Sequence, residues 1–300
     1  MRVSRKLLLL FSILMIIPGN SPADTDDVSK TVRILFTNNS NGKLKDCNCP
    51  NDPYGGLAER VALIREYRGN YHDFLLFDSG GYLGLSSVIK TGPAVFRMME
   101  IMEYDAYGIG DQELYFSFAT FMERFEQWTG PIVNASLGTN EKKQVFTPYK
   151  VFISGSVRIG VIGLASQETF KFFPDENRDF SVEDPDSTLE RLLPRLERES
   201  DYIVVLSQMG REKDQEIADR WKEIDLIIGG HSQTLLEKPI RIGECRIVQA
   251  GKNGGRVGEI IVRFDGKKKV GDFSYKLLEV SERYKIPEDI RNTFEKELKL

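Results

Sequence analysis

Short apolar runs alternate with stretches of helical periodicity along most of the chain. The apolar runs are rich in β-branched and aromatic residues and end in glycine or polar residues, a pattern that predicts buried strands. These runs lie at residues 31–37, 73–81, 105–113, 131–136, 201–210 and 224–233. Between them, apolar residues recur at helical spacing over residues 55–68, 93–103, 116–128, 186–199 and 212–221. Strands that alternate with helices indicate an α/β fold with a largely parallel core.

The remaining β-type segments add antiparallel strands to that core. Residues 150–165 continue on either side of Gly155 and Ser156, which predicts a hairpin. The segments "CRIVQAG", "VGEIIVRFD" and "GDFSYKLLEVS" predict further strands, so the sheets are expected to be mixed. Because no repeat, linker or composition break follows residue 30, we expect one domain over residues 31–280 and a C-terminal helix within residues 281–300.

The first 23 residues have the pattern of a cleaved secretory signal peptide. Arg2, Arg5 and Lys6 precede the apolar run "LLLLFSILMII", which is too short to span a bilayer comfortably. Ser21 and Ala23 follow as small residues of the kind that a signal peptidase reads. An uncleaved membrane anchor is the alternative. The pattern predicts a secreted, periplasmic protein with no membrane attachment after cleavage.

Charge and cysteine content narrow the classes of function. The chain of 300 residues carries 45 acidic and 41 basic side chains and a formal net charge of −4. Cleavage of the signal peptide removes basic residues and makes the mature chain more acidic, which argues against binding to nucleic acid. Three cysteines are too few, and odd in number, for a scaffold held by disulfides. The cysteines therefore predict a local site.

Polar loops follow five of the predicted strands. They are "TNNSNG" (37–42), "DSGG" (78–81), "GDQE" (110–113), "LSQMG" (206–210) and "GGHSQ" (229–233). Ligands of α/β folds bind beyond the carboxyl ends of strands, so these loops can converge on one site. Together with "GGLAER" (55–60), and in this order, they resemble the motifs of the calcineurin-like metallophosphatase superfamily. The branch they resemble is that of the periplasmic 5′-nucleotidases and UDP-sugar hydrolases (UshA-like), in their N-terminal domain.

The resemblance covers about residues 31–280 and implies a sandwich of two mixed β-sheets flanked by helices. It also implies a site in which two metal ions, bridged by an aspartate, activate a water for attack on phosphorus. The family's ligand positions are mostly altered here, because the sequence has Asn39, Asn41, Gly81, Gln112, Gln208 and Gln233. Gly81 stands at the bridging aspartate, and neutral amides are weak ligands for transition metals.

His231 is the family histidine that remains, and Asp111 stands where the family has asparagine. We therefore expect neither a dinuclear centre nor efficient phosphatase activity. The alternative within the enzyme class is a phosphoesterase with a rebuilt, mononuclear site. A non-catalytic interaction module is the third interpretation.

Cys47 and Cys49 form a CxC pair between the first strand and "GGLAER". This arrangement resembles a branch described as UshA-like (seleno)proteins, in which selenocysteine sometimes replaces a cysteine, and the resemblance favours redox chemistry. As catalytic residues, the two thiols would form a strained and readily reduced disulfide. Alternatively, the pair binds one transition-metal ion, such as Zn²⁺, together with His231 and Asp111. A purely structural pair is the third option. The partner expected is a redox protein or a small phosphorylated ligand.

Four other residues have simpler interpretations. Cys245 begins an apolar strand, which predicts a buried, inert thiol. His72 stands at the start of a strand and is predicted to lie at the surface. Asp78 is predicted to accept hydrogen bonds in a turn rather than to bind metal. Glu113 is expected to add negative charge to the pocket beside Asp111.

Overall fold

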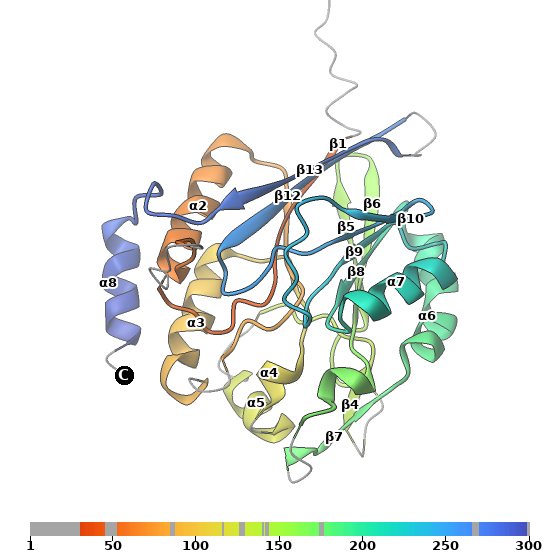
Figure 1. Ribbon diagram of the computed structural model, residues 1–300, viewed down its shortest axis with the longest axis horizontal. Helices are drawn as coiled ribbons and strands as arrows, with labels where there is room; N and C mark the ends of the chain where they lie inside the picture. Colours follow the sequence, from red (N-terminus) through yellow and green to blue (C-terminus); the bar gives the residue numbers. More distant parts are fainter. Residues whose placement is uncertain are drawn as a thin grey trace, which may run out of the picture.

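The computed structural model (Figure 1) describes residues 31–45, 53–84, 88–115, 117–125, 130–139, 141, 144–173, 177–265 and 270–298. The predicted signal peptide and the predicted CxC pair, Cys47 and Cys49, lie outside these residues. Within the described ranges, no helix is both long and apolar enough to cross a membrane.

The first sheet has five strands in the order β13-β12-β1-β2-β3. β1 (Thr31–Thr37), β2 (Leu75–Asp78) and β3 (Ala106–Tyr107) are parallel, whereas β12 (Arg256–Phe264) and β13 (Val270–Glu279) extend the sheet with antiparallel pairing. β1 and β12 lie side by side in opposite directions. The loop that follows β1 therefore lies beside the loop that precedes β12.

The second sheet has six strands in the order β10-β11-β9-β8-β6-β5. Its four inner strands are parallel, and an antiparallel strand closes each edge. The predicted hairpin is confirmed as the pair of β5 and β6. The strands are β5 (Tyr149–Ser154), β6 (Val157–Leu164), β8 (Tyr202–Ser207), β9 (Leu226–Ile228), β10 (Ile240–Ile242) and β11 (Cys245–Val248).

The two sheets pack face to face, with helices on both outer faces (Figure 1). Side chains from β1, β6, β8 and β12 meet in the apolar layer between the sheets. α2 (Leu57–Asn70), α3 (Val88–Met102) and α8 (Glu288–Glu297) lie on the side of the first sheet. α6 (Pro185–Glu199) and α7 (Arg211–Arg220) cover the second. The predicted sandwich of two mixed sheets flanked by helices is confirmed.

The smaller elements lie at the end of the sandwich to which the parallel strands point (Figure 1). They are α4 (Asp111–Leu114), α5 (Phe118–Phe125), the 3₁₀ turn Gln167–Phe170, and the two-stranded sheet of β4 (Leu137–Thr139) and β7 (Phe180–Val182).

The prediction of a strand over residues 131–136 is wrong. This segment makes single bridges, through Ile132 and Val133, and the named strand β4 begins only at Leu137. Asn134 explains the interruption, because its side-chain Oδ1 accepts hydrogen bonds from the N–H groups of Ser136 and Leu137. Such a local side-chain bond competes with the strand ladder and turns the chain.

Candidate functional site

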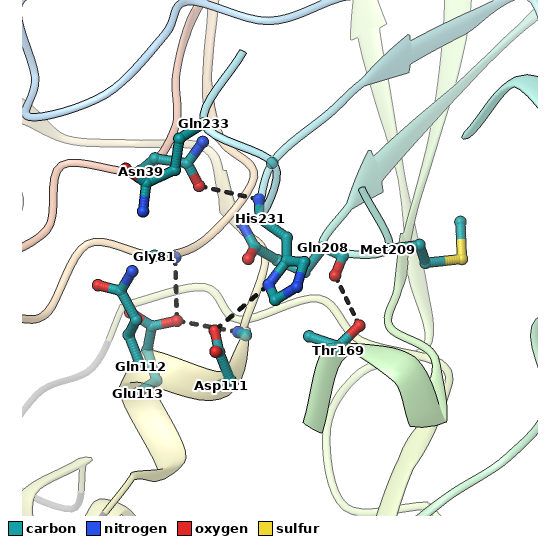
Figure 2. A network of polar contacts seen from close by, with 12 residues as sticks. Asn39, Gly81, Asp111, Gln112, Glu113, Thr169, Gln208, Met209, His231 and Gln233 are labelled. Carbon is teal, nitrogen blue, oxygen red and sulfur yellow. Dashed lines mark hydrogen bonds and ion pairs between the residues drawn. The ribbon is translucent and has the colours of Figure 1, made fainter. Parts of the chain in front are cut away.

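The polar loops predicted from the sequence do converge at one place. Asn39 and Asn41 follow β1, Gly81 follows β2, and residues 111–113 begin α4 just after β3. From the other sheet, Gln208 follows β8, and His231 and Gln233 follow β9. Figure 2 shows the side chains of Asp111, His231 and Gln208 close together, with Asn39 and Gln233 beside His231. The site therefore joins the carboxyl ends of strands from both sheets.

Asn41 is the centre of a network of side-chain amides. Its Nδ2 donates to Gln233 Oε1 at 3.3 Å and to Asn253 Oδ1 at 3.0 Å. Its Oδ1 accepts from Gln112 Nε2 at 2.8 Å. Asn41 thus connects the loops that follow β1, β3 and β9 with the loop that precedes β12.

Asn39 links the same loops through a second set of bonds. Its Oδ1 accepts from the His231 backbone N–H at 2.9 Å, and its Nδ2 donates to the Gly251 carbonyl at 3.2 Å. Its own backbone carbonyl accepts from the Asn253 N–H at 2.7 Å. Asn39 is 1% exposed, so these bonds are shielded from water.

His231 and Asp111 form the only ion pair in which a described histidine takes part. Their Nδ1 and Oδ1 atoms are 3.7 Å apart, and each side chain is about one-third exposed, at 34% and 31%. The contact with Asp111 raises the pKa of the His231 imidazole, partial burial opposes this, and the charge of Asp214 adds to the increase. The pair can therefore hold a proton or present one imidazole nitrogen to the cleft.

Gln208 is enclosed by glycines. A Cβ atom on Gly80, Gly110 or Gly230 would lie within 3 Å of the Gln208 side chain, so only glycine leaves room for it. Gln208 is 1% exposed, and its Nε2 has no hydrogen-bond partner among the residues that the structure describes. Its backbone carbonyl accepts from Thr169 Oγ1 at 2.6 Å (Figure 2). Within the described part of the chain, Gln208 is therefore a buried amide with an unsatisfied donor.

The sequence predicted that Glu113 adds negative charge to the pocket beside Asp111, and this prediction is wrong, because the carboxylate is bound by backbone N–H groups. Its carboxylate accepts from the N–H groups of Gly81 at 3.0 Å, Leu83 at 3.0 Å and Gly110 at 2.9 Å. Burial raises its pKa to about 7, against the lowering effect of these three bonds, and the charge of Asp111 raises it further. Glu113 therefore fastens the loop after β2 to the loop before α4.

Two buried carboxylates, Asp78 and Asp214, accept hydrogen bonds from residues at the ends of the strands that lead to the site. Asp78 accepts from the Gly80 N–H at 2.8 Å and from Thr37 Oγ1, which matches the predicted role as a turn acceptor. Asp214, which the sequence did not point to, accepts from Ser207 Oγ, while its Oδ2 has no partner in the described part of the chain. Burial raises the pKa of Asp214 to about 7. Its burial could not be predicted from the sequence, because a charged residue in the first turn of a helix, here α7, is ordinarily exposed.

The structure brings together eight of the positions that the sequence analysis selected: Asn39, Asn41, Gly81, Asp111, Gln112, Gln208, His231 and Gln233. Among the described residues, no group of three or more His, Cys, Asp or Glu side chains is arranged to hold a metal ion.

Cys245 lies in β11, 2% exposed, and burial raises its thiol pKa to about 12. His72 is exposed. Both agree with the expectations from sequence.

Comparison with known proteins gives a consistent result. A snake venom 5′-nucleotidase of Gloydius brevicauda is 30% identical over 223 residues, covering 71% of this chain and 36% of the relative. The 5′-nucleotidase of Vibrio cholerae is 26% identical over 311 residues, covering 89% and 55%. The chain thus spans about a third to a half of these relatives. No family model matches the chain.

Solved structures agree with the fold. A 5′-nucleotidase precursor from Thermus thermophilus superposes with a TM-score of 0.78 at 24% identity, covering 90% of this chain and 58% of the other. The calcineurin-like phosphoesterase YfkN from Bacillus subtilis superposes with a TM-score of 0.75 at 20% identity, covering 90% and 97%.

The sandwich and its convergent loops define a calcineurin-like metallophosphatase fold, and the chain belongs to that superfamily. Within it, the chain corresponds to the N-terminal domain of the 5′-nucleotidase, UshA-like type.

Proposed function

We propose that this chain is an exported 5′-nucleotidase-like protein that is not an efficient phosphatase. In this proposal its cleft serves thiol redox chemistry or metal binding through Cys47 and Cys49. Export rests on the N-terminal pattern of residues 1–23.

One observation carries the first part of the proposal: of the amides at the family's ligand positions, Gln112 and Gln233 both bond to Asn41. A dinuclear site needs several carboxylate and imidazole ligands and a bridging carboxylate. Here Asn41 satisfies its amide through Gln112, Gln233 and Asn253, and Gly81 has no side chain. Asp111 and His231 are the ionisable side chains left in contact. These residues do not fit two closely spaced cations.

The second part of the proposal assigns the chemistry to the CxC pair. In the redox form, the thiols of Cys47 and Cys49 give up two electrons and two protons as their disulfide forms. A disulfide of an exported partner protein takes up both and becomes a dithiol. In the metal form, the two thiolates and His231 bind one Zn²⁺-like ion, with Asp111 as a further ligand.

Metal analysis and thiol titration of the mature protein test this assignment. The variants Cys47→Ser and Cys49→Ser remove the pair, and Cys245→Ala is the matched control because its buried thiol lies in β11. A reversible two-electron couple, or one bound metal ion, that both serine variants lose and the control retains supports the proposal. The absence of both from the unmodified protein contradicts it and favours the interaction module.

The second candidate is a mononuclear phosphoesterase, and the 3.7 Å contact of His231 with Asp111 is the observation that favours it. Phosphomonoesters and phosphodiesters should be assayed with added Mn²⁺, Co²⁺ or Zn²⁺. Efficient turnover that Asp111→Ala or His231→Ala abolishes would establish this candidate in place of the first.

A further inference from the structure

We propose that Asn39, Asn41, Gln112, Gln233 and Asn253 form an amide clasp, a set of mutually fitted side chains that holds the loops of the cleft together without metal. The inference builds on the proposed loss of the dinuclear centre but adds to it. Three of the altered positions, Asn41, Gln112 and Gln233, form one hydrogen-bonded unit with Asn253. Asn39 joins this unit through its backbone carbonyl, which accepts from the Asn253 N–H.

The bonds of the clasp require amides in particular. Asn41 uses both hydrogens of its Nδ2, toward Gln233 and Asn253, and its Oδ1 accepts from Gln112. A neutral imidazole has one donor and one acceptor, and a carboxylate has no donor at all. Neither side chain can replace the three bonds that Asn41 makes.

The same argument applies to Asn39. Its amide accepts from the His231 N–H and donates to the Gly251 carbonyl. An aspartate, which the family motif has at this position, would lose the donor and set a carboxylate against that carbonyl oxygen. These two contacts therefore require a side chain with both an acceptor and a donor, which asparagine provides.

The backbone at the clasp carries strain that the clasp must offset. Seven non-glycine residues of the described chain have positive φ, and Asn39, Asn41, Gln233 and Asn253 are four of them, with φ between 47° and 59°. His231, bonded to Asn39, is a fifth at 62°. Such conformations persist where surrounding contacts over-determine them. Their concentration here indicates that the clasp, rather than local preference alone, sets these loops.

The clasp also joins parts of the chain that are far apart in sequence. Asn41 and Asn253 are separated by 212 positions, and Asn41 and Gln233 by 192. The bonds connect two neighbouring loops of the first sheet, the loop after β1 and the loop before β12, to the loop after β9 in the second sheet. The clasp thus ties the two sheets together at the site.

Asn41→Gly tests the clasp, because glycine relieves the positive φ while removing all three amide bonds. Glu103→Gly is the matched control: Glu103 has φ 55° but is exposed and lies outside the cleft. We expect Asn41→Gly to lower the melting temperature by about 2–4 °C, and Glu103→Gly to leave it unchanged or raise it. Gln112→Ala should lower it in the unmodified protein but not in the Asn41→Gly background, because its bond partner is then gone.

Hydrogen exchange provides a second readout that does not depend on the melting temperature. We expect the His231 and Asn253 backbone amides to be protected equally with and without EDTA, and Asn39→Gly to remove the protection of His231. A melting temperature for Asn41→Gly no lower than that of Glu103→Gly, additive effects of Asn41→Gly and Gln112→Ala, or loss of protection in EDTA would each overturn the clasp. Phosphatase activity tests the proposed function separately, so the two can fail independently.

Discussion

Gly81→Asp is the sharpest test of how this site is built, because it returns the carboxylate that the family motif has at this position. We expect the substitution to destabilise the protein and to create no phosphatase activity. Gly81 has φ +71°, a left-handed conformation that costs a residue with a side chain roughly 1–2 kcal/mol. Aspartate tolerates this region better than most residues, which places the backbone cost near the lower value.

Crowding at Asn39 adds to that cost. A Cβ on Gly81 would lie 3.1 Å from Asn39 Oδ1 and 3.2 Å from Asn39 Cα, closer than ordinary van der Waals contact. Asn39 cannot move aside without weakening its bond to the His231 N–H, and a lost buried hydrogen bond costs about 1 kcal/mol. The expected loss in free energy of unfolding is therefore about 2 kcal/mol.

Urea unfolding followed by circular dichroism measures this loss. Gly243→Asp is the matched control, because Gly243 also has positive φ, at +59°, but a Cβ there would meet nothing within 4 Å. It should lose only the backbone contribution, about 1 kcal/mol. Equal losses in both variants would refute the crowding argument. Turnover of phosphomonoesters by Gly81→Asp with Mn²⁺ would refute the view that the remaining amides prevent a dinuclear centre.

Three further predictions concern buried groups: Gln208 at the site, and Asp225 and Cys245 at the amino-terminal ends of β9 and β11. Gln208→Met replaces the side chain by one of similar volume and removes the Nε2 donor, which has no partner among the described residues. The melting temperature should therefore stay the same or rise by about 2 °C, and a fall of several degrees would mean that this amide has a partner. Burial raises the pKa of Asp225 from its ordinary value to about 6, so its ionisation destabilises the folded state as pH rises toward and through this value. Asp225→Asn should therefore gain about 2 kcal/mol relative to the unmodified protein between pH 4 and pH 7 in urea unfolding, and a pH-independent difference would contradict the shift. In a Cys47→Ser/Cys49→Ser double variant, the buried Cys245 should react with a thiol reagent only after denaturation, so labelling of the native protein would show that the thiol is accessible.

The elements of the fold could be predicted from sequence because side-chain periodicity is a local property. Apolar runs at 31–37 and 201–210 correspond to β1 and β8, and the hairpin around Gly155 forms as expected. The prediction failed at residues 131–136, where the apolar run is real but the Asn134 side chain captures two backbone N–H groups. A single polar side chain can override periodicity when its bonds depend on the local path of the chain.

The candidate site was predictable as a set of positions but not as a set of contacts. The order of the polar loops selected Asn39, Asn41, Gln112 and His231 before any geometry was known, since loops at the carboxyl ends of strands converge in α/β folds. Glu113 could not be placed correctly, because whether it faces the pocket or three backbone N–H groups depends on how two loops approach each other. Asn253 had no motif to mark it.

By itself, the sequence determined the alternation of strands and helices, the order of the polar loops, and the amide side chains that these loops carry. The tertiary structure alone decided that Gln112 and Gln233 both bond to Asn41 and that Gln208 lies among three glycines. It also decided that Asp214 is buried, with one oxygen that has no partner among the described residues. Periodicity reports which face of an element is apolar. Hydrogen-bond partners are chosen by the packing of two sheets, which brings together residues such as Asn41 and Asn253 across 212 positions of the chain.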